Sequence, residues 1–351
     1  MAEMKKVVNI KVIGVGGAGN NVVNSMLETC VEGVDLVVVN TDLQDLNKSN
    51  CANKIQIGEK LTGGMGAGAK PEIGQRAAEE SKAAIAQALE GTDMVFVTAG
   101  MGGGTGTGAA PIVAGLAHDA GILTVGVVTK PFGFEGKQRM TKADAGIAEL
   151  ADKVDSLIII PNDRLKYVTD QKITFANAFG IADDVLKQAV ESIAELVSYD
   201  ERVFMNLDFA DVTAIMKNAG RAHMGVGHAT GRDKAEQAAL AAVASPLLET
   251  SINGATGVLI NVTGSRELGL DDVETAANIV MEAANPEANI IFGATFDDTY
   301  EDEMRVTVIA TGFEEKKSGR DLFTAAGEVF GKPAEASGDD LDDIFKIFAK
   351  K

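Results

Sequence analysis

Two glycine-rich segments contain the residues best suited to hold a phosphorylated ligand. Residues 14–21 read GVGGAGNN and residues 102–108 read GGGTGTG. Each follows an apolar run and leads into an Ala/Val-rich stretch of helical character. Glycine lets backbone N–H groups approach a ligand closely, and a helix start adds the positive end of a dipole. Two such segments at one edge of a sheet predict a polyphosphate held from both sides.

The first segment alone also fits a dinucleotide. Its G-x-G-x-x-G pattern follows a predicted strand, and Asp42 comes later, where a ribose-binding acid is expected. An NAD-dependent oxidoreductase therefore stays open as an alternative. The second glycine segment has no role in that alternative, and the three histidines offer no clear acid–base pair. These histidines are His118, His223 and His228.

The chain contains no G-x-x-x-x-G-K-[ST] motif, so the lysine of a P-loop is missing. Phosphate charge would then be met by backbone amides, helix dipoles and Mg²⁺. Five glycines and two threonines within residues 102–108 make a merely close-packed loop a poor explanation. We therefore expect a nucleotide whose phosphates are bound by backbone groups.

The elements that must position these segments alternate through the first half of the chain. Apolar runs followed by helical stretches indicate a parallel sheet that is covered on both faces. In such sheets ligands bind at the carboxyl ends of the strands, where both glycine segments fall. The expected strands are residues 7–13, 35–39, 93–98, 122–129 and 155–160. Helices are expected at residues 18–31, 72–89, 107–119 and 136–152.

A long helical pattern at residues 175–199 separates the two halves. At about 1.5 Å per residue it would be roughly 36 Å long and cross the whole domain. A short helix at 212–217 and a second α+β domain with a mixed sheet are expected after it. The strands expected there are residues 257–263, 289–294 and 304–311, with helices at 232–243 and 271–284.

Composition excludes several classes of protein. The net charge of −19 over 351 residues argues against a nucleic-acid partner. Cys30 and Cys51 are too few for a disulfide framework, fit a reducing cytosol and are expected to be inert. The run at residues 7–13 is expected to be a buried strand, not a signal peptide, and no run approaches the ~18 apolar residues that span a bilayer. We expect a cytoplasmic protein without membrane insertion.

Six motifs, taken in order, carry a family resemblance over roughly residues 7–313. Residues 102–108 match the tubulin/FtsZ signature GGGTG[ST]G in full, and the other five follow the order found in FtsZ. The chain therefore resembles the FtsZ family of tubulin-like cell-division GTPases. The other five motifs are residues 16–21 (GGAGNN), 40–42 (NTD), 66–68 (GAG), 131–136 (PFGFEG) and 206–211 (NLDFAD).

The resemblance implies a Rossmann-like GTPase domain, a long central helix and a second α+β domain. Its implied ligands are GTP or GDP and Mg²⁺, with the ion held mainly by phosphates and water and no protein ligand assigned to it. The implied parts are a GTP-binding domain at 7–174, the central helix at 175–200, an activation domain at 201–313, a flexible linker at 314–338 and a partner-binding peptide at 339–351.

The resemblance also assigns the nucleotide contacts. It implies that the first glycine segment holds the diphosphate, that the signature cradles the β- and γ-phosphates, and that residues 66–68 sense the γ-phosphate. Glu135 and Arg139 would contact the ribose and phosphates, Asn162 and Asp183 would bind guanine, and Phe179 would stack on it. The implied set is Gly17, Ala18, Gly19, Asn20, Asn21, Gly66, Ala67, Gly68, Gly103, Gly104, Thr105, Gly106, Thr107, Glu135, Arg139, Asn162, Phe179 and Asp183, with Gln44 near the phosphates.

Asn206, Asp208 and Asp211 resemble the family's catalytic residues. Two acids at a helix start could equally be a helix cap and a dipole partner. The long helix would place them too far from the nucleotide of their own subunit. We therefore expect them to act on the nucleotide of a neighbour, which requires a head-to-tail homopolymer.

The last residues of the chain predict a binding peptide. Leu341, Ile344, Phe345 and Phe348 fall at helical spacing between acids and lysines. The resemblance implies that this peptide binds membrane-tethering and regulatory division proteins while the polymer forms the division ring. The peptide lacks the family's usual proline, and residues 198–205 replace its usual Pro-Gly-Leu-like entry to the acidic loop. A tubulin relative that forms filaments outside division is a further alternative.

Overall fold

The computed structural model describes residues 8–29, 33–167, 173–197, 203–205, 208–248, 251–297 and 299–313. Cys30, Asn206, most of segment 198–205 and the expected linker and terminal peptide lie outside these residues. Within them, eleven strands form one sheet in the order β3-β2-β1-β4-β5-β6-β8-β11-β9-β10-β7. None of the helices in the described part is long and apolar enough to cross a membrane.

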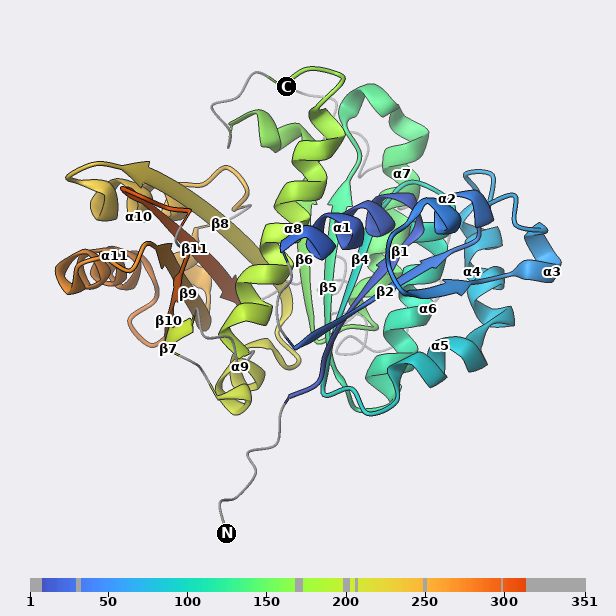
Figure 1. Cartoon of the computed structure of the whole chain (residues 1–351), viewed down its shortest axis with the longest axis horizontal. Coiled ribbons are helices and arrows are strands. Elements are labelled where there is room, and N and C mark those ends of the chain that lie inside the picture. Colours follow the sequence, from blue (N-terminus) through green and yellow to red (C-terminus); the bar gives the residue numbers. More distant parts are fainter. Residues whose placement is uncertain are drawn as a thin grey trace, which may run out of the picture. The chain divides into compact units, whose positions relative to one another are not determined.

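The first six strands of this order are parallel (Figure 1). Their side chains are buried almost without interruption in the central strands, as the continuous Val/Ile runs predict. These strands are β1 (Ile10–Val15), β2 (Val34–Asn40), β3 (Asn53–Gln56), β4 (Met94–Gly100), β5 (Leu123–Lys130) and β6 (Ser156–Pro161).

Helices cover both faces of the parallel strands. On one face, α1 (Gly16–Thr29) and α8 (Ala178–Val197) share a core with β1, β4 and β5. The opposite face is covered by α4 (Pro71–Glu80), α5 (Lys82–Leu89), α6 (Thr105–Asp119) and α7 (Lys137–Ala151). The short helices are α2 (Leu43–Lys48), α3 (Glu59–Thr62) and the 3₁₀ turns η1 (Gly133–Glu135) and η2 (Asn162–Tyr167).

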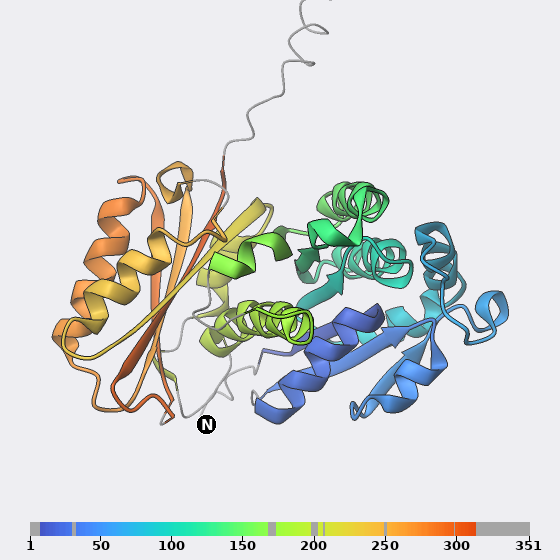
Figure 2. The same ribbon diagram turned by 90° about the horizontal axis from the view of Figure 1, so that it is seen from above.

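The second half continues the sheet with mixed pairing. Strand β8 runs parallel to β6, β11 is antiparallel to both β8 and β9, and β9 is parallel to β10. Two helices cover the outer face, as Figure 2 shows at its left side. The elements are β7 (Val203–Met205), α9 (Phe209–Met216), β8 (Gly220–Thr230), α10 (Lys234–Val243), η3 (Ile252–Gly254), β9 (Gly257–Gly264), α11 (Leu270–Ala283), β10 (Asn289–Phe296) and β11 (Glu303–Thr311).

Helix α8 lies between the two halves and joins their cores. Leu186, Ile193 and Leu196 are fully buried in a cluster that includes residues of both β5 and β9. Its 20 residues span about 30 Å, shorter than the pattern at 175–199 predicts. Helix α8 therefore runs between the carboxyl ends and the amino ends of the parallel strands.

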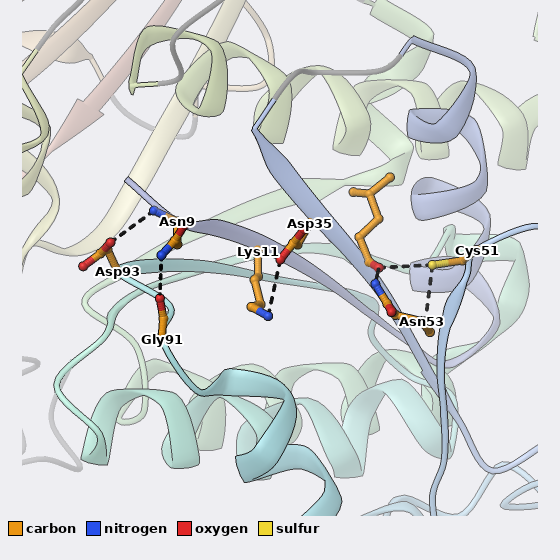
Figure 3. Close-up of polar contacts among 8 residues, drawn as sticks. Asn9, Lys11, Asp35, Cys51, Asn53, Gly91 and Asp93 are labelled. Atoms are coloured by element: carbon orange, nitrogen blue, oxygen red, sulfur yellow. Dashed lines mark hydrogen bonds and ion pairs between the residues drawn. The ribbon is translucent and has the colours of Figure 1, made fainter. Parts of the chain in front are cut away.

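Polar contacts fix the strands near the amino edge of the parallel sheet (Figure 3). The Asn9 backbone N–H donates to Asp93 at 3.1 Å, and the Asn9 amide donates to the Gly91 carbonyl at 2.9 Å. Cys51 is buried, and its thiol donates to the Leu36 carbonyl at 3.2 Å. Burial raises the pKa of the Cys51 thiol, which agrees with the expectation of an inert cysteine.

The mixed α/β fold class is confirmed, and all eight strands expected from the sequence are present. The prediction of a single helix at 72–89 is wrong, because the structure has two helices there, α4 and α5, which are separated at Ser81. The Ser81 hydroxyl accepts a hydrogen bond from the Gly58 N–H at 3.1 Å, which ties this break to the chain before α3. The eleven-residue strand β8 was not expected from the sequence.

Candidate functional site

A cavity of about 360 Å³ opens at the carboxyl edge of the parallel strands. The end of β1, the loop after β4 and the start of α6 form its floor, and loop residues 65–68 form one wall. This is the edge at which the sequence places both glycine segments. The two segments and residues 66–68 therefore share one site.

Two glycines allow these loops to touch. A Cβ on Gly16, whose φ is +74°, would lie 2.9 Å from the Gly106 nitrogen. A Cβ on Gly104 would lie 2.8 Å from Ala67 Cβ and 2.9 Å from the Lys70 nitrogen. All three distances are too short for a real side chain, so glycine is needed at each position. Helices α1 and α6 begin at these loops and direct their positive ends into the cavity.

Hydrogen bonds hold the wall of the cavity at both ends. The Gly66 N–H donates to the Thr41 carbonyl at 3.3 Å, and the Thr41 and Thr105 hydroxyls are 2.6 Å apart. At the other end, the Lys142 ammonium of α7 donates to the Ala69 carbonyl at 2.7 Å. Ala69 has a φ of 57°, a left-handed conformation that few non-glycine residues adopt. The loop is therefore tied both to the residue that follows β2 and to α7.

The first turns of α8 and the start of η2 form the far end of the cavity. Phe179 and Asp183 line it from α8, and Asn162 lines it from η2. The Asn162 Oδ1 is buried and has no hydrogen-bond partner in the structure. A buried acceptor without a partner is costly, so a ligand that donates there would be stabilised. This unpaired acceptor and the glycine cradle together fit a nucleotide.

The carboxyl of Asp183 is perturbed. Burial raises its pKa to about 7, and the negative charge of Asp184 acts in the same direction. A hydrogen bond from the Asn21 amide, at 3.3 Å, opposes the shift. Asn21 does not line the cavity itself, and its described contact is with Asp183. A shifted carboxyl in a cleft is a common property of binding sites.

Glu135 and Arg139 form an ion pair along another wall of the cavity. Arg139 Nε lies 3.0 Å from Glu135 Oε2, and the other carboxylate oxygen accepts from the Phe132 N–H at 2.8 Å. Arg139 is the one cation among the described residues that line the cavity. Asp42 and Asp45 line it as well, and the described residues contain no group of three potential metal-binding side chains.

Most of the expected nucleotide contacts come together here. Those that line the cavity are Gly17, Ala18, Gly66, Ala67, Gly68, Gly103, Gly104, Thr105, Gly106, Glu135, Arg139, Asn162, Phe179 and Asp183. Gly19, Asn20, Asn21 and Thr107 do not line it, and neither does Gln44. Asn20 and Thr107 are buried, and the Thr107 hydroxyl accepts from the Gly102 N–H at 2.8 Å, so it supports the loop from behind.

Sequence reasoning missed several lining residues. Asp42 is expected as a ribose-binding acid of a dinucleotide site and lies in the motif at 40–42, but it is absent from the expected GTP contacts, as is Asp45, one helical turn further on. The N-cap position of Asp42 before α2 was a readable signal, since its side chain accepts from the Gln44 and Asp45 N–H groups. The other missed residues are Val15, Asn40, Met65, Gly100, Met101, Thr129, Pro131 and Ala182.

Asp208 and Asp211 lie at the opposite edge of the sheet. Helix α9 follows Asp208 directly, and its residues Phe209 and Thr213 line a hollow together with Leu123 at the amino end of β5. Strand β4, seven residues long, separates the two edges by about 20 Å. Both acids are exposed, and the Asp208 side chain makes no capping hydrogen bond. We call these acids and α9 the acidic edge.

Two family models match the chain, and solved structures are similar to it. Residues 9–170 match the GTPase domain of the tubulin/FtsZ family, and residues 220–314 match the C-terminal domain of the FtsZ family. An empty FtsZ dimer from M. jannaschii is 41% identical, with 95% of this chain and 96% of that chain covered and a TM-score of 0.85. A point mutant of M. jannaschii FtsZ is 43% identical, with 88% and 92% covered and the same TM-score.

A more distant structure shares the fold. CetZ2 from Haloferax volcanii, solved as a GTPγS-bound protofilament, is 22% identical, with 92% of this chain and 98% of that chain covered and a TM-score of 0.73. The two family matches fall on the two halves that α8 joins. The chain belongs to the FtsZ family of tubulin-like GTPases.

Proposed function

We propose that this protein is a GTP-dependent polymerising protein of the division ring, in which each subunit hydrolyses the GTP of its neighbour. The observation that carries the proposal is the separation of two half-sites. The nucleotide cavity lies at the carboxyl edge of the sheet, and Asp208 and Asp211 lie at the amino edge. M. jannaschii FtsZ, to which the chain is similar, has been solved as a dimer.

The nucleotide would lie across the whole cavity. Its phosphates would occupy the glycine cradle, where backbone N–H groups and the starts of α1 and α6 offset their charge. Its base would stack on Phe179, and the Asp183 carboxylate would accept from guanine N1–H and N2–H₂. Adenine lacks that pair of donors, so Asp183 would select guanine.

Magnesium fits the phosphate end of the cavity. Asp42 and Asp45 place two carboxylates beside the glycine cradle, so bound phosphates there need a cation. These side chains, with phosphate oxygens and water, would hold Mg²⁺ in its usual oxygen environment. When bound, the ion would neutralise part of the phosphate charge.

Hydrolysis would take place between subunits. A water molecule, positioned by Asp208 and Asp211 of the next subunit, would attack the γ-phosphorus in line with the leaving group. The new bond joins the water oxygen to phosphorus, and the bond to the β-phosphate bridge breaks. The water proton passes to a carboxylate or to solvent, leaving GDP and phosphate. A heterologous contact of this kind repeats into an open filament.

The polymer would assemble in the cytoplasm at the division site. Residues 339–351 would bind membrane-tethering and regulatory division proteins, supported by their amphipathic spacing. A pull-down that compares the full chain with a chain ending at Gly338 tests the binding role.

Sedimentation with GTP, GDP or NAD, with phosphate release measured in parallel, tests the function as a whole. The proposal predicts pelleting and phosphate release with GTP, and little pelleting with GDP or NAD. Binding of NAD without pelleting would favour the oxidoreductase alternative. Pelleting without phosphate release would favour a filament that does not hydrolyse its nucleotide.

A further inference from the structure

The 3₁₀ turn η2 holds one of the residues at the base-binding end of the cavity. Asn162 is its first residue, and the buried Oδ1 of this side chain has no hydrogen-bond partner in the structure. A shift of about 1 Å is enough to break a hydrogen bond, so this acceptor serves a ligand only if η2 is held in place. The contacts of η2 therefore decide whether Asn162 is ready to bind.

Two side chains anchor η2 within the first half of the chain. Asp163 accepts from the Gly133 N–H of η1, with both carboxylate oxygens 3.1 Å from the nitrogen. Leu165 is fully buried in the core cluster that contains α8. Both contacts connect η2 to elements that form the cavity, since Glu135 of η1 and Phe179 of α8 line it.

Arg164 lies between these two residues and reaches the second half of the chain. Its Nη1 donates to the Pro246 carbonyl at 2.8 Å and to the Leu248 carbonyl at 3.1 Å. Both carbonyls belong to the turn after α10, where the Leu248 N–H donates to the Ser245 carbonyl at 3.0 Å. A guanidinium nitrogen of this kind has two hydrogens, so it can donate to both carbonyls at once. We call residues 245–248 the anchor turn.

The anchor turn is a firm support because it packs into two cores. Leu247 is buried in the cluster that contains α8, and Leu248 packs against the cluster of the second half. Arg164 itself does not line the nucleotide cavity. Its effect on a bound nucleotide therefore has to pass through η2 and Asn162.

We propose that Arg164 is a positioning residue for the guanine base, which holds Asn162 in place by fixing η2 to the anchor turn. The inference rests on the proposed nucleotide site, whose base-binding end contains Asn162. It gives the second half of the chain a part in nucleotide binding, although none of the described residues of that half lines the cavity. The coupling is reciprocal, so a bound base also stabilises the anchor turn.

A double-mutant cycle tests the inference in the full chain. GDP affinity is measured, because the acidic edge of a neighbour cannot hydrolyse GDP. Arg164→Met removes the donors, and we expect about tenfold weaker GDP binding. Asn162→Ala should cause at least the same loss. When both are combined, Arg164→Met should add less than about a twofold loss, since both substitutions remove the same contact. A merely structural role would make the two losses multiply.

Two further variants separate positioning from charge and from folding. Lys166→Met removes a positive charge from the same turn, outside the nucleotide cavity, and should bind GDP like the parent. Arg164→Lys keeps a cation that can donate, so it should recover part of the affinity. Arg164→Lys also takes the place of Arg164→Met in the cycle if the methionine variant does not fold.

Hydrogen exchange measures the coupling from the anchor turn. In the parent, GDP should slow exchange of the Leu248 N–H about tenfold, the same factor that Arg164→Met removes from the affinity. Arg164→Met, saturated with GDP, should lack this protection.

The inference is overturned if Arg164→Met binds GDP like the parent, or if its loss multiplies fully with that of Asn162→Ala. It is also overturned if GDP leaves the anchor turn unprotected in the parent, or if Lys166→Met shows the same loss, because charge alone would then explain the effect. Failure of the proposed nucleotide site has a different signature: Asn162→Ala and Asp183→Asn would both bind GDP like the parent, whatever the Arg164 variants do.

Discussion

The two edges of the sheet differ in what they offer to a ligand. The carboxyl edge has two helix starts, a glycine cradle and an unpaired buried acceptor on Asn162. The amino edge has closed polar contacts, such as those of Asn9 with Asp93 and Gly91, and two exposed acids, one directly before α9 and one in its first turn. The carboxyl edge therefore offers a cavity for a ligand, and the amino edge offers exposed acids. The difference follows from the direction of the parallel strands.

Removal of an acid at the amino edge should have the largest effect on activity. Asp211→Ala should reduce kcat for GTP about 10²- to 10⁴-fold, the range for loss of a group that positions or accepts a proton. GTP affinity should not change, because the residue lies at the far edge from the cavity. Phosphate release and nucleotide binding are the measurements. Asp271→Ala, which removes a first-turn acid of α11, is the matched control and should stay active.

The second prediction changes the base-binding end of the cavity. Asp183→Asn should weaken GTP binding by about 100-fold, because it removes a charged acceptor for guanine. The same variant should gain affinity for XTP, since the asparagine N–H can donate to the C2 carbonyl of xanthine. Competition between the two nucleotides measures the switch. Retained preference for GTP would contradict the assignment of Asp183.

The raised pKa of Asp183 adds a pH test. Only the ionised carboxylate accepts from guanine, and the pKa of the free site is about 7. GTP affinity should therefore be full above pH 7 and fall as pH decreases, by about tenfold per unit well below 7. Asp183→Asn should lack this decrease of GTP affinity. Titration of the nucleotide phosphates affects both proteins equally, so it cancels when the two are compared. An equal dependence of GTP affinity on pH in both proteins would refute the role of the Asp183 carboxylate.

The third prediction concerns the contact between the loops. Gly104→Ala places a Cβ against Ala67 and the Lys70 nitrogen, so it should displace the wall of the cavity. We expect a loss of about 1–3 kcal/mol of stability and about tenfold weaker GTP binding. A Cβ at Gly103 meets nothing within 4 Å, so Gly103→Ala should keep its Tm without nucleotide. Similar Tm values for both variants would contradict the steric argument.

The smallest expected effect belongs to the tether between α7 and the loop. Lys142→Met removes the hydrogen bond to the Ala69 carbonyl, which is partly solvated. GTP affinity should fall about three- to fivefold, in line with one exposed hydrogen bond. GDP affinity should change less, because the loop lies beside the expected γ-phosphate position. Titration of both nucleotides checks this, and an equal loss for both would argue against it.

Much of the parallel half could be predicted from the sequence, because buried strands there are continuous apolar runs. Strand β8 could not, since its eleven residues include glycines and polar residues without such a run. The reason is tertiary: a Cβ on Gly227 would meet Ala241 Cβ at 2.8 Å, so glycine there allows α10 to pack closely. The break at Ser81 likewise depends on a contact with Gly58, which periodicity within residues 72–89 does not contain.

Site residues could be predicted where a short stretch of sequence carries the chemistry by itself. The glycine segments indicated phosphate binding without any relative. Asp183 was different, because the sequence alone favours a solvated helix acid, and the resemblance was needed to place it against guanine. Its burial depends on how α8 meets α1, where Asn21 lies. Met65 and Thr129 line the cavity only because distant loops converge, and no short pattern marks them.

Dilution of the intact protein tests most directly whether two subunits together form the site of GTP hydrolysis. Phosphate release per subunit is measured from far below to far above the concentration at which pelleting begins, with GTP saturating throughout. We expect almost no turnover at high dilution, and a steep rise that coincides with assembly. A rate per subunit that stays constant across this range would show that one molecule holds a complete site, and hydrolysis between subunits would then be wrong.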